Sequence, residues 1–275
     1  MGLNLKFKPT LEPRETNMNR LRHVTILLAG ILASSSFLMS AGISRADDVK
    51  PPEKKGWESV ASAGLTLTRG NSENFLANVS INSTRKWTDD ELLLGASAGY
   101  GKTKDRSNGT TTKTDDYIKA FAQWNHLFTP KIYGGLRFDI VHDDVADLDY
   151  RFTVSPLVGY YFFRKPNTSL SAEAGPAFIY EKQGGEDAHG YFAARLGEKY
   201  EYTFVNKAKV WETFEFLPQV DDVENYIINV EVGVSAPITK SLDVRLTAFD
   251  TYDNRPAAGR LPNDLKLMAG IGFKF

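Results

Sequence analysis

The residues best suited to chemistry in this chain of 275 residues form the segment Val141-His-Asp-Asp144. A histidine held by a carboxylate can act as a general base and activate a serine that the fold brings near it. The next predicted strand places Ser155 several residues deeper than His142, and no motif typical of acylhydrolases or proteases is present. We therefore expect His142 to be a solvated histidine and the protein not to be an enzyme, with a lipid or lipopolysaccharide hydrolase as an alternative.

Four aspartates in the same region are candidate metal ligands. Asp143, Asp144, Asp147 and Asp149 supply the oxygen ligands that calcium prefers. Their spacing is not the ordered spacing of a dedicated calcium loop, and a charged surface loop explains them as well. The sequence thus predicts no catalytic residue, no metal site and no cofactor.

Net charge and cysteine content exclude a nucleic-acid-binding protein, a disulfide-bonded protein and a lipoprotein. The formal net charge is −1 and no basic block stands out, so nucleic-acid binding has no electrostatic support. The chain contains no cysteine, which excludes disulfide bonds and a lipid-modified N-terminus.

The N-terminal region resembles an export signal. Arg20 and Arg22 precede a short apolar run, and Ser44 and Ala46 fit the small-x-small cleavage rule. The run is shorter than the roughly 20 apolar residues that a membrane helix needs. We predict a signal peptide over residues 1–46, a short periplasmic segment over 47–56 and one domain over 57–275, with either Met1 or Met18 as the start.

The rest of the chain shows the period of two that is typical of strands. The closing segment, 265–275, places leucine, alanine, isoleucine and phenylalanine on one face and lysine, methionine and glycine on the other. Twelve such segments occur between Trp57 and Phe275. Tight breaks alternate with looser polar breaks, among them Thr103–Asp115, which is the layout of short periplasmic turns and longer outer loops. Tryptophan, tyrosine and phenylalanine concentrate near the short turns, as in an interfacial aromatic girdle.

Charged side chains recur on the second face of strand after strand. Such a face must contact water or a paired polar network, because unpaired charges in a dry core are costly. The predicted lumen-facing residues are Arg137, Asp139, Arg151, Arg195, Lys199, Glu201, Glu215, Glu231, Asp243 and Arg245. Because the two signs are nearly balanced, we expect a closed or poorly conducting lumen, whereas an ion-selective pore would carry a ring of one sign.

One local feature conflicts with this pattern. The predicted register places Glu198 and Glu212 opposite each other on the lipid face, which is energetically unfavourable. Either a bulge near Gly197 or Pro218 shifts the register, which we favour, or the pair marks a functional position.

The segment Gly64–Glu73, following Trp57, and the terminal Gly-Phe-Lys-Phe275 resemble the domain of unknown function 481 family, whose members are often labelled salt-induced outer-membrane proteins. The resemblance extends from about Trp57 to Phe275. The closing strand also resembles the signal read by the barrel-assembly machinery, with Gly270, Phe273 and Phe275 at the expected spacing and Met268 where a polar residue is usual. The resemblance implies a barrel in the cell envelope and no established reaction.

Together these features predict an all-β protein: an antiparallel transmembrane outer-membrane β-barrel of about twelve strands. We expect it in the outer membrane of a Gram-negative bacterium after signal-peptide cleavage, in contact with lipid and lipopolysaccharide, and inserted by the barrel-assembly machinery. The expected role is structural or related to envelope stress. The alternatives are a porin-like channel for small solutes, the hydrolase named above and a soluble periplasmic β-sandwich.

Overall fold

The computed structural model describes residues 56–68, 72–105 and 109–275. The predicted signal peptide and nearly all of the predicted periplasmic segment lie outside the described residues. The described part of the chain contains twelve strands. They are β1 (Trp57–Thr68), β2 (Ser72–Lys86), β3 (Asp90–Asp105), β4 (Thr111–Leu127), β5 (Ile132–Asp143), β6 (Leu148–Lys165), β7 (Thr168–Gln183), β8 (His189–Thr203), β9 (Lys209–Pro218), β10 (Tyr226–Pro237), β11 (Leu242–Asp253) and β12 (Asn263–Lys274). None of the described residues forms a helix long and apolar enough to cross a membrane.

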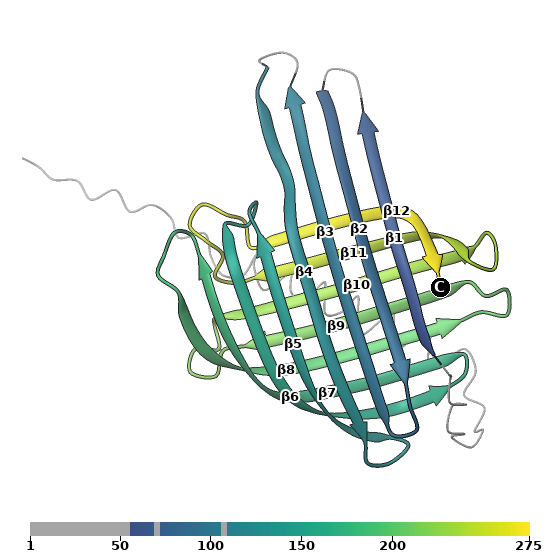
Figure 1. Ribbon diagram of the computed structural model, residues 1–275. Helices are drawn as coiled ribbons and strands as arrows, with labels where there is room; N and C mark the ends of the chain where they lie inside the picture. The colour runs from purple at the N-terminus through teal and green to yellow at the C-terminus, as the bar shows by residue number, and fades with distance from the viewer. Residues whose placement is uncertain (1–55, 69–71, 106–108) are drawn as a thin grey trace, which may run out of the picture. The chain divides into compact units, whose positions relative to one another are not determined.

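The strands form a closed barrel in which each strand pairs antiparallel with its neighbours in sequence, and β1 pairs with β12 to complete the ring (Figure 1). This confirms the predicted all-β class, the antiparallel barrel and the strand count. The alternative of a β-sandwich is wrong, because the described strands make one closed sheet instead of two packed sheets.

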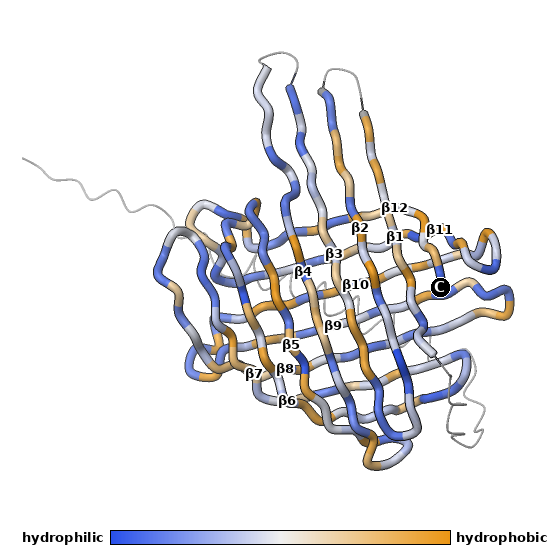
Figure 2. The backbone as a smooth tube through the Cα atoms, viewed as in Figure 1, coloured by the Kyte–Doolittle hydropathy of each residue, from blue (hydrophilic) through white to orange (hydrophobic). Residues whose placement is uncertain are grey.

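The two faces of the sheet differ in polarity because successive side chains of a strand point to opposite faces. Val232 and Val234 of β10 and Val244 and Leu246 of β11 are exposed on the outer face, whereas Asp243 of β11 is fully buried on the inner face. Apolar segments recur along the strands around the barrel wall (Figure 2). A soluble protein does not expose an apolar surface of this extent, whereas a barrel that spans a membrane must do so.

The breaks between strands follow the predicted order, with one correction. The predicted loose break Thr103–Asp115 is largely strand, since Lys104 still pairs with Thr111. β-Branched threonines favour the extended conformation. This segment lengthens β3 and β4. Together with β1 and β2 they project beyond the other strands at the end with the looser breaks (Figure 1).

The predicted opposition of Glu198 and Glu212 is also wrong. Glu198 lies opposite Phe214 and Glu212 opposite Tyr200, in a ladder without a register shift, so the predicted register was displaced by two residues. The turn between β8 and β9 uses Lys207 at φ 65°, which places the reversal one residue later than predicted. A displacement of two residues keeps both carboxylates on the outer face but separates them diagonally.

The ladder that closes the barrel is short. Only Val60–Ala63 of β1 pair with Lys274–Ile271 of β12, followed toward the chain end by two backbone hydrogen bonds of 3.0 and 3.2 Å between Ser59 and Phe275. Gly270 is needed here, because a Cβ at this position would lie 2.4 Å from the carbonyl oxygen of Ala63.

The membrane-facing role of the outer surface predicts a position-specific effect. Replacing Val232, near the middle of β10, with arginine should lower the free energy of unfolding in lipid vesicles by about 2–4 kcal/mol, because a charge then enters hydrocarbon. Val232→Leu is the matched control and should unfold like the original chain. Denaturant titration of the vesicle-inserted proteins measures both, and equal stability of the arginine variant would contradict a lipid-facing wall.

Candidate functional site in the barrel lumen

The inner face of the barrel carries a network of charged residues centred on Arg195 of β8. This guanidinium is 4% exposed and makes ion pairs with Asp139 of β5 and Glu173 of β7, both at 3.6 Å, and with Glu215 of β9. Its Nε and Nη1 atoms have no hydrogen-bond partner, so these contacts are electrostatic. One cation thus holds carboxylates from three other strands.

A second arginine extends this cluster toward β4. Arg137 donates to both carboxylate oxygens of Asp139, at distances of 2.7 to 3.0 Å, which is possible because residues two apart on a strand share a face. It also donates to Gln123 at 3.1 Å, and Gln123 in turn donates to Glu173 at 3.0 Å. The central layer therefore connects five strands from β4 to β9.

A layer near the short turns was not identified from the sequence. Buried Glu91 of β3 accepts hydrogen bonds from Tyr161 at 2.7 Å and from Arg164 at 2.5 Å, both on β6. Glu91 and Arg164 lie at strand ends beside tight breaks, where the alternation of a strand is hardest to follow in the sequence. Strand alternation could have placed Glu91 inward, but Arg164 faces inward only after a register shift between Tyr161 and Phe163, for which the sequence gives no signal.

A layer near the looser breaks joins opposite walls of the barrel. Arg151 of β6 pairs with Glu181 of the neighbouring β7 and donates at 2.9 Å to Asp253 of β11. Tyr191 of β8 donates to Glu181 at 3.2 Å. Because four strands separate β6 from β11 in one direction and six in the other, the Arg151–Asp253 contact crosses the lumen.

The remaining predicted lumen residues lie on the wall from β8 to β11. Arg245 donates to Asp243 at 2.6 Å, and Asp243 also pairs with Lys274 at 3.0 Å. The other contacts are Trp211 to Glu231 at 2.6 Å and Lys209 to Glu201 at 2.7 Å, while Lys199 is exposed on the same face of β8 as Arg195.

The lumen also contains apolar clusters, which the predicted set of charged lumen-facing residues did not include. Ile179, Leu217 and Ile227 belong to a buried cluster on β7 to β10. Tyr133 and Leu157 belong to a second one on β4 to β6. Side chains therefore fill part of the interior and separate the charged layers.

The residues considered for catalysis do not form a site. The Nδ1 atom of His142 lies 2.9 Å from the carbonyl oxygen of Asp149, and strand alternation places His142 on the outer face. Ser155 is 0% exposed and pairs with Arg137 on the inner face. His142 and Ser155 thus lie on opposite faces of the sheet and do not form a base–nucleophile pair.

Three of the four aspartates considered for calcium each pair with a different lysine. Lys266 lies 3.2 Å from Asp143, Lys113 lies 2.6 Å from Asp144 and Lys182 lies 2.9 Å from Asp149. The hydrogen bond from Lys113 holds the pKa of the Asp144 carboxyl below its usual value. Within the ranges that the structure describes, no group of three or more histidine or carboxylate side chains converges as a metal site would require.

The predicted assembly signal lies at the closing seam. Phe273 and Phe275 are exposed on the outer face and their rings stack at 5.9 Å. Gly270 lies against β1, as described above, and the backbone of Phe275 bonds to Ser59.

Comparisons with solved structures give remote similarities. The translocator domain of the autotransporter NalP from Neisseria meningitidis is 14% identical, covering 90% of this chain and 98% of that chain with a TM-score of 0.46. The NanC porin is 9% identical, covering 79% and 100% with a TM-score of 0.48, and the KdgM porin is 10% identical, covering 79% and 99% with a TM-score of 0.40.

No curated protein matches the chain. A family model described as "Protein of unknown function, DUF481" matches residues 61–275, which is most of the chain and almost the whole barrel. This protein therefore belongs to the DUF481 family.

Proposed function

We propose that the protein is an outer-membrane barrel with a structural or envelope-stress-related role, whose lumen is closed by ion pairs between its walls. The observation that carries this proposal is the pairing of Arg151 on β6 with Asp253 on β11, across the interior. Arg195, which holds carboxylates from β5, β7 and β9, supports it from the centre of the barrel.

The apolar outer face supports a membrane location, and the closing strand supports insertion by the barrel-assembly machinery. Because a strand edge in hydrocarbon cannot satisfy its backbone groups with water, a lipid-facing sheet has to close on itself, as this one does. Phe273 and Phe275 present the terminal aromatic residues outward, where the machinery and then lipid would contact them. Lipopolysaccharide would contact the other end of the outer face, near the looser breaks. We also propose that a signal peptide directs export of the chain and is then cleaved.

The pattern of charges argues against an open pore as the main role. A selective pore presents one sign of charge to the permeating ion, whereas here positive and negative side chains pair directly. Paired charges in a narrow interior hold a fixed geometry, since breaking one pair leaves a buried charge without compensation. The network of ion pairs therefore holds the strands of the barrel at fixed positions relative to one another.

A small-solute channel is the second candidate, and one observation favours it. Lys199 is exposed to solvent on the inner face of β8, near the Lys209–Glu201 pair, so the wall on that side is not packed by side chains. Water therefore reaches this part of the lumen.

Conductance in planar bilayers distinguishes the two candidates. The refolded protein, identified as a barrel by heat-modifiable migration on a gel, should give no reproducible conductance steps. Arg151→Ala combined with Asp253→Ala removes the pair that crosses the lumen and should produce steps. Lys182→Ala, which removes a rim ion pair with Asp149, is the control and should stay silent. Regular steps from the original chain would establish the channel instead.

The central cluster predicts a large effect on stability. Arg195→Met should lower the free energy of unfolding by about 3–5 kcal/mol, because Glu173 and Glu215 lose a buried partner. Lys199→Met, on the same face of the same strand but exposed, should change it by less than about 0.5 kcal/mol. Urea unfolding in vesicles compares the two, and similar values would show that the Arg195 cluster does not brace the barrel.

A further inference from the structure

The strands β1 and β12 separate halfway along the closing seam. Ser59 and Phe275 exchange two backbone hydrogen bonds, so every second pair after them, Ala61 with Phe273 and Ala63 with Ile271, is of the same hydrogen-bonded type. The next such pair would be Leu65 with Ala269, but the β1–β12 ladder ends before it. On its other edge β1 pairs with β2 for its whole length.

The open half of the seam is lined on the outside by leucines. Leu65 and Leu67 of β1 are 62% and 69% exposed, and Leu265 and Leu267 of β12 are 67% and 66% exposed. Both strand edges there carry backbone groups directed into the gap, which hydrocarbon alone does not satisfy. This part of the wall is therefore apolar on its surface and incomplete in its hydrogen bonding.

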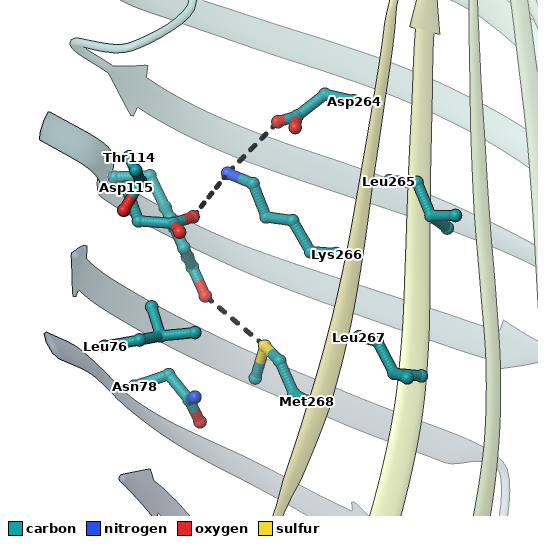
Figure 3. Close-up of a pocket in the computed structure, with 10 residues that line it drawn as sticks. Leu76, Asn78, Thr114, Asp115, Asp264, Leu265, Lys266, Leu267 and Met268 are labelled. Carbon is teal, nitrogen blue, oxygen red and sulfur yellow. Dashed lines mark hydrogen bonds and ion pairs between the residues drawn. The ribbon is translucent and has the colours of Figure 1, made fainter. Parts of the chain in front are cut away.

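A cavity of about 220 Å³ lies directly inside this half of the seam. Its walls are Leu76 and Asn78 of β2, Thr114, Asp115 and Tyr117 of β4, and residues 264–268 of β12. No described residue of β1 lines it, although β1 stands between β12 and β2 in the strand order. Figure 3 shows Lys266 and Met268 on the inner side of β12 and Leu265 and Leu267 pointing away from them. β12 is thus the wall of the cavity, and its unpaired edge adjoins the gap to the outside.

The cavity has an ionic end and an apolar end (Figure 3). At the ionic end the Lys266 ammonium lies 3.3 Å from Asp115, 3.2 Å from Asp143 and 3.1 Å from Asp264, and 4.3 Å from the centre of the Tyr117 ring.

At the apolar end Leu76 and Met268 face each other across the cavity, and the Tyr117 hydroxyl donates to the Met268 sulfur at 3.7 Å. Asp264, at the ionic end, lies near the start of β12, while Met268 lies closer to the closed part of the seam.

The charges at the ionic end do not balance. Three carboxylates surround one ammonium, and if Lys119, whose Nζ lies 5.6 Å from the Tyr117 ring, is counted as a second cation, one negative charge remains in excess. An anionic head group would be repelled here, whereas an amine would find an acceptor.

We propose that the open half of this seam is a lateral entrance through which an amphiphile with a primary amine reaches the cavity from the outer leaflet. The amine binds beside Asp115 and Asp264, the first part of the chain contacts Leu76 and Met268, and the remainder leaves between the leucines of β1 and β12. The cavity is smaller than the roughly 300–1,000 Å³ of pockets that enclose a whole ligand, so most of the chain stays in lipid. The proposal rests on the proposed membrane location but not on a closed lumen.

The absence of native cysteine allows the seam to be closed by a disulfide. Leu65→Cys with Ala269→Cys joins the two positions that the ladder leaves unpaired, and Ala63→Cys with Ile271→Cys, which are already partners, is the control. The probe is dodecylamine carrying a photoreactive diazirine on its chain, added to the barrel in phosphatidylcholine vesicles. Mass spectrometry then locates the covalent label, and dodecanoic acid with the same diazirine tests the head group.

The amine probe should label Leu76 or Met268, and the acid probe should label them about tenfold less, the difference expected from one charge-assisted hydrogen bond. The lock between positions 65 and 269 should remove this labelling and reductant should restore it, while the control lock should leave it unchanged. Asp115→Asn with Asp264→Asn should remove the preference for the amine without any crosslink.

Three results would refute the lateral site: labelling that survives the oxidised lock, equal labelling by the two probes, and no labelling inside the cavity by either. Gel migration on boiling is measured on every sample. A native chain that lacks heat-modifiable migration would instead refute the proposed membrane barrel, so the two failures are distinguishable.

Discussion

Every backbone N–H and C=O group in a lipid-facing wall needs a partner within the protein, because hydrocarbon offers none. A single antiparallel sheet meets this requirement only by joining its first strand to its last, and here β1 and β12 make that connection through Val60–Ala63 and the Ser59–Phe275 bonds. Closure then assigns each strand one face toward lipid and one toward the interior. The alternation of Val232 and Val234 with Gly233 and Ser235 follows from that assignment.

Closure also determines the character of the interior. Inward residues of facing walls meet in a space narrow enough for Arg151 to reach Asp253 from β6 to β11. Charges in such a space are stable only when paired, so Arg195 and its three carboxylates form one unit instead of a lining of separate charges. The apolar clusters around Ile179 and Tyr133 exclude water between the layers, which strengthens these ion pairs.

The sequence predicted those features that depend only on strand alternation. The count of twelve strands and the outward valines of β10 follow from a period of two and the positions of the breaks. The ion-pair partners of inward side chains could not be predicted. A period of two indicates which face of the sheet Arg195 occupies, but not which strands lie close enough to contact it. The register between β8 and β9 depended on the left-handed conformation of Lys207, for which a non-glycine residue gives little signal. Arg164 was missed for a similar reason, since its direction depends on a local irregularity in β6.

The seam between β1 and β12 departs from the requirement that organises most of the wall. Beyond Ala63 the two edges are unpaired, yet Leu65 and Leu267 keep the apolar alternation of a lipid-facing wall. The sequence gives no sign of this, because an open and a closed edge have the same period. Gly64 and Gly270 lie where the strands part, and their backbones approach so closely that a side chain on either would force the strands apart earlier. A purely structural barrel would be more stable if the ladder between β1 and β12 were complete. The ladder instead ends at a glycine pair with a charged cavity directly behind it, as expected if β1 and β12 have to separate in this half of the seam.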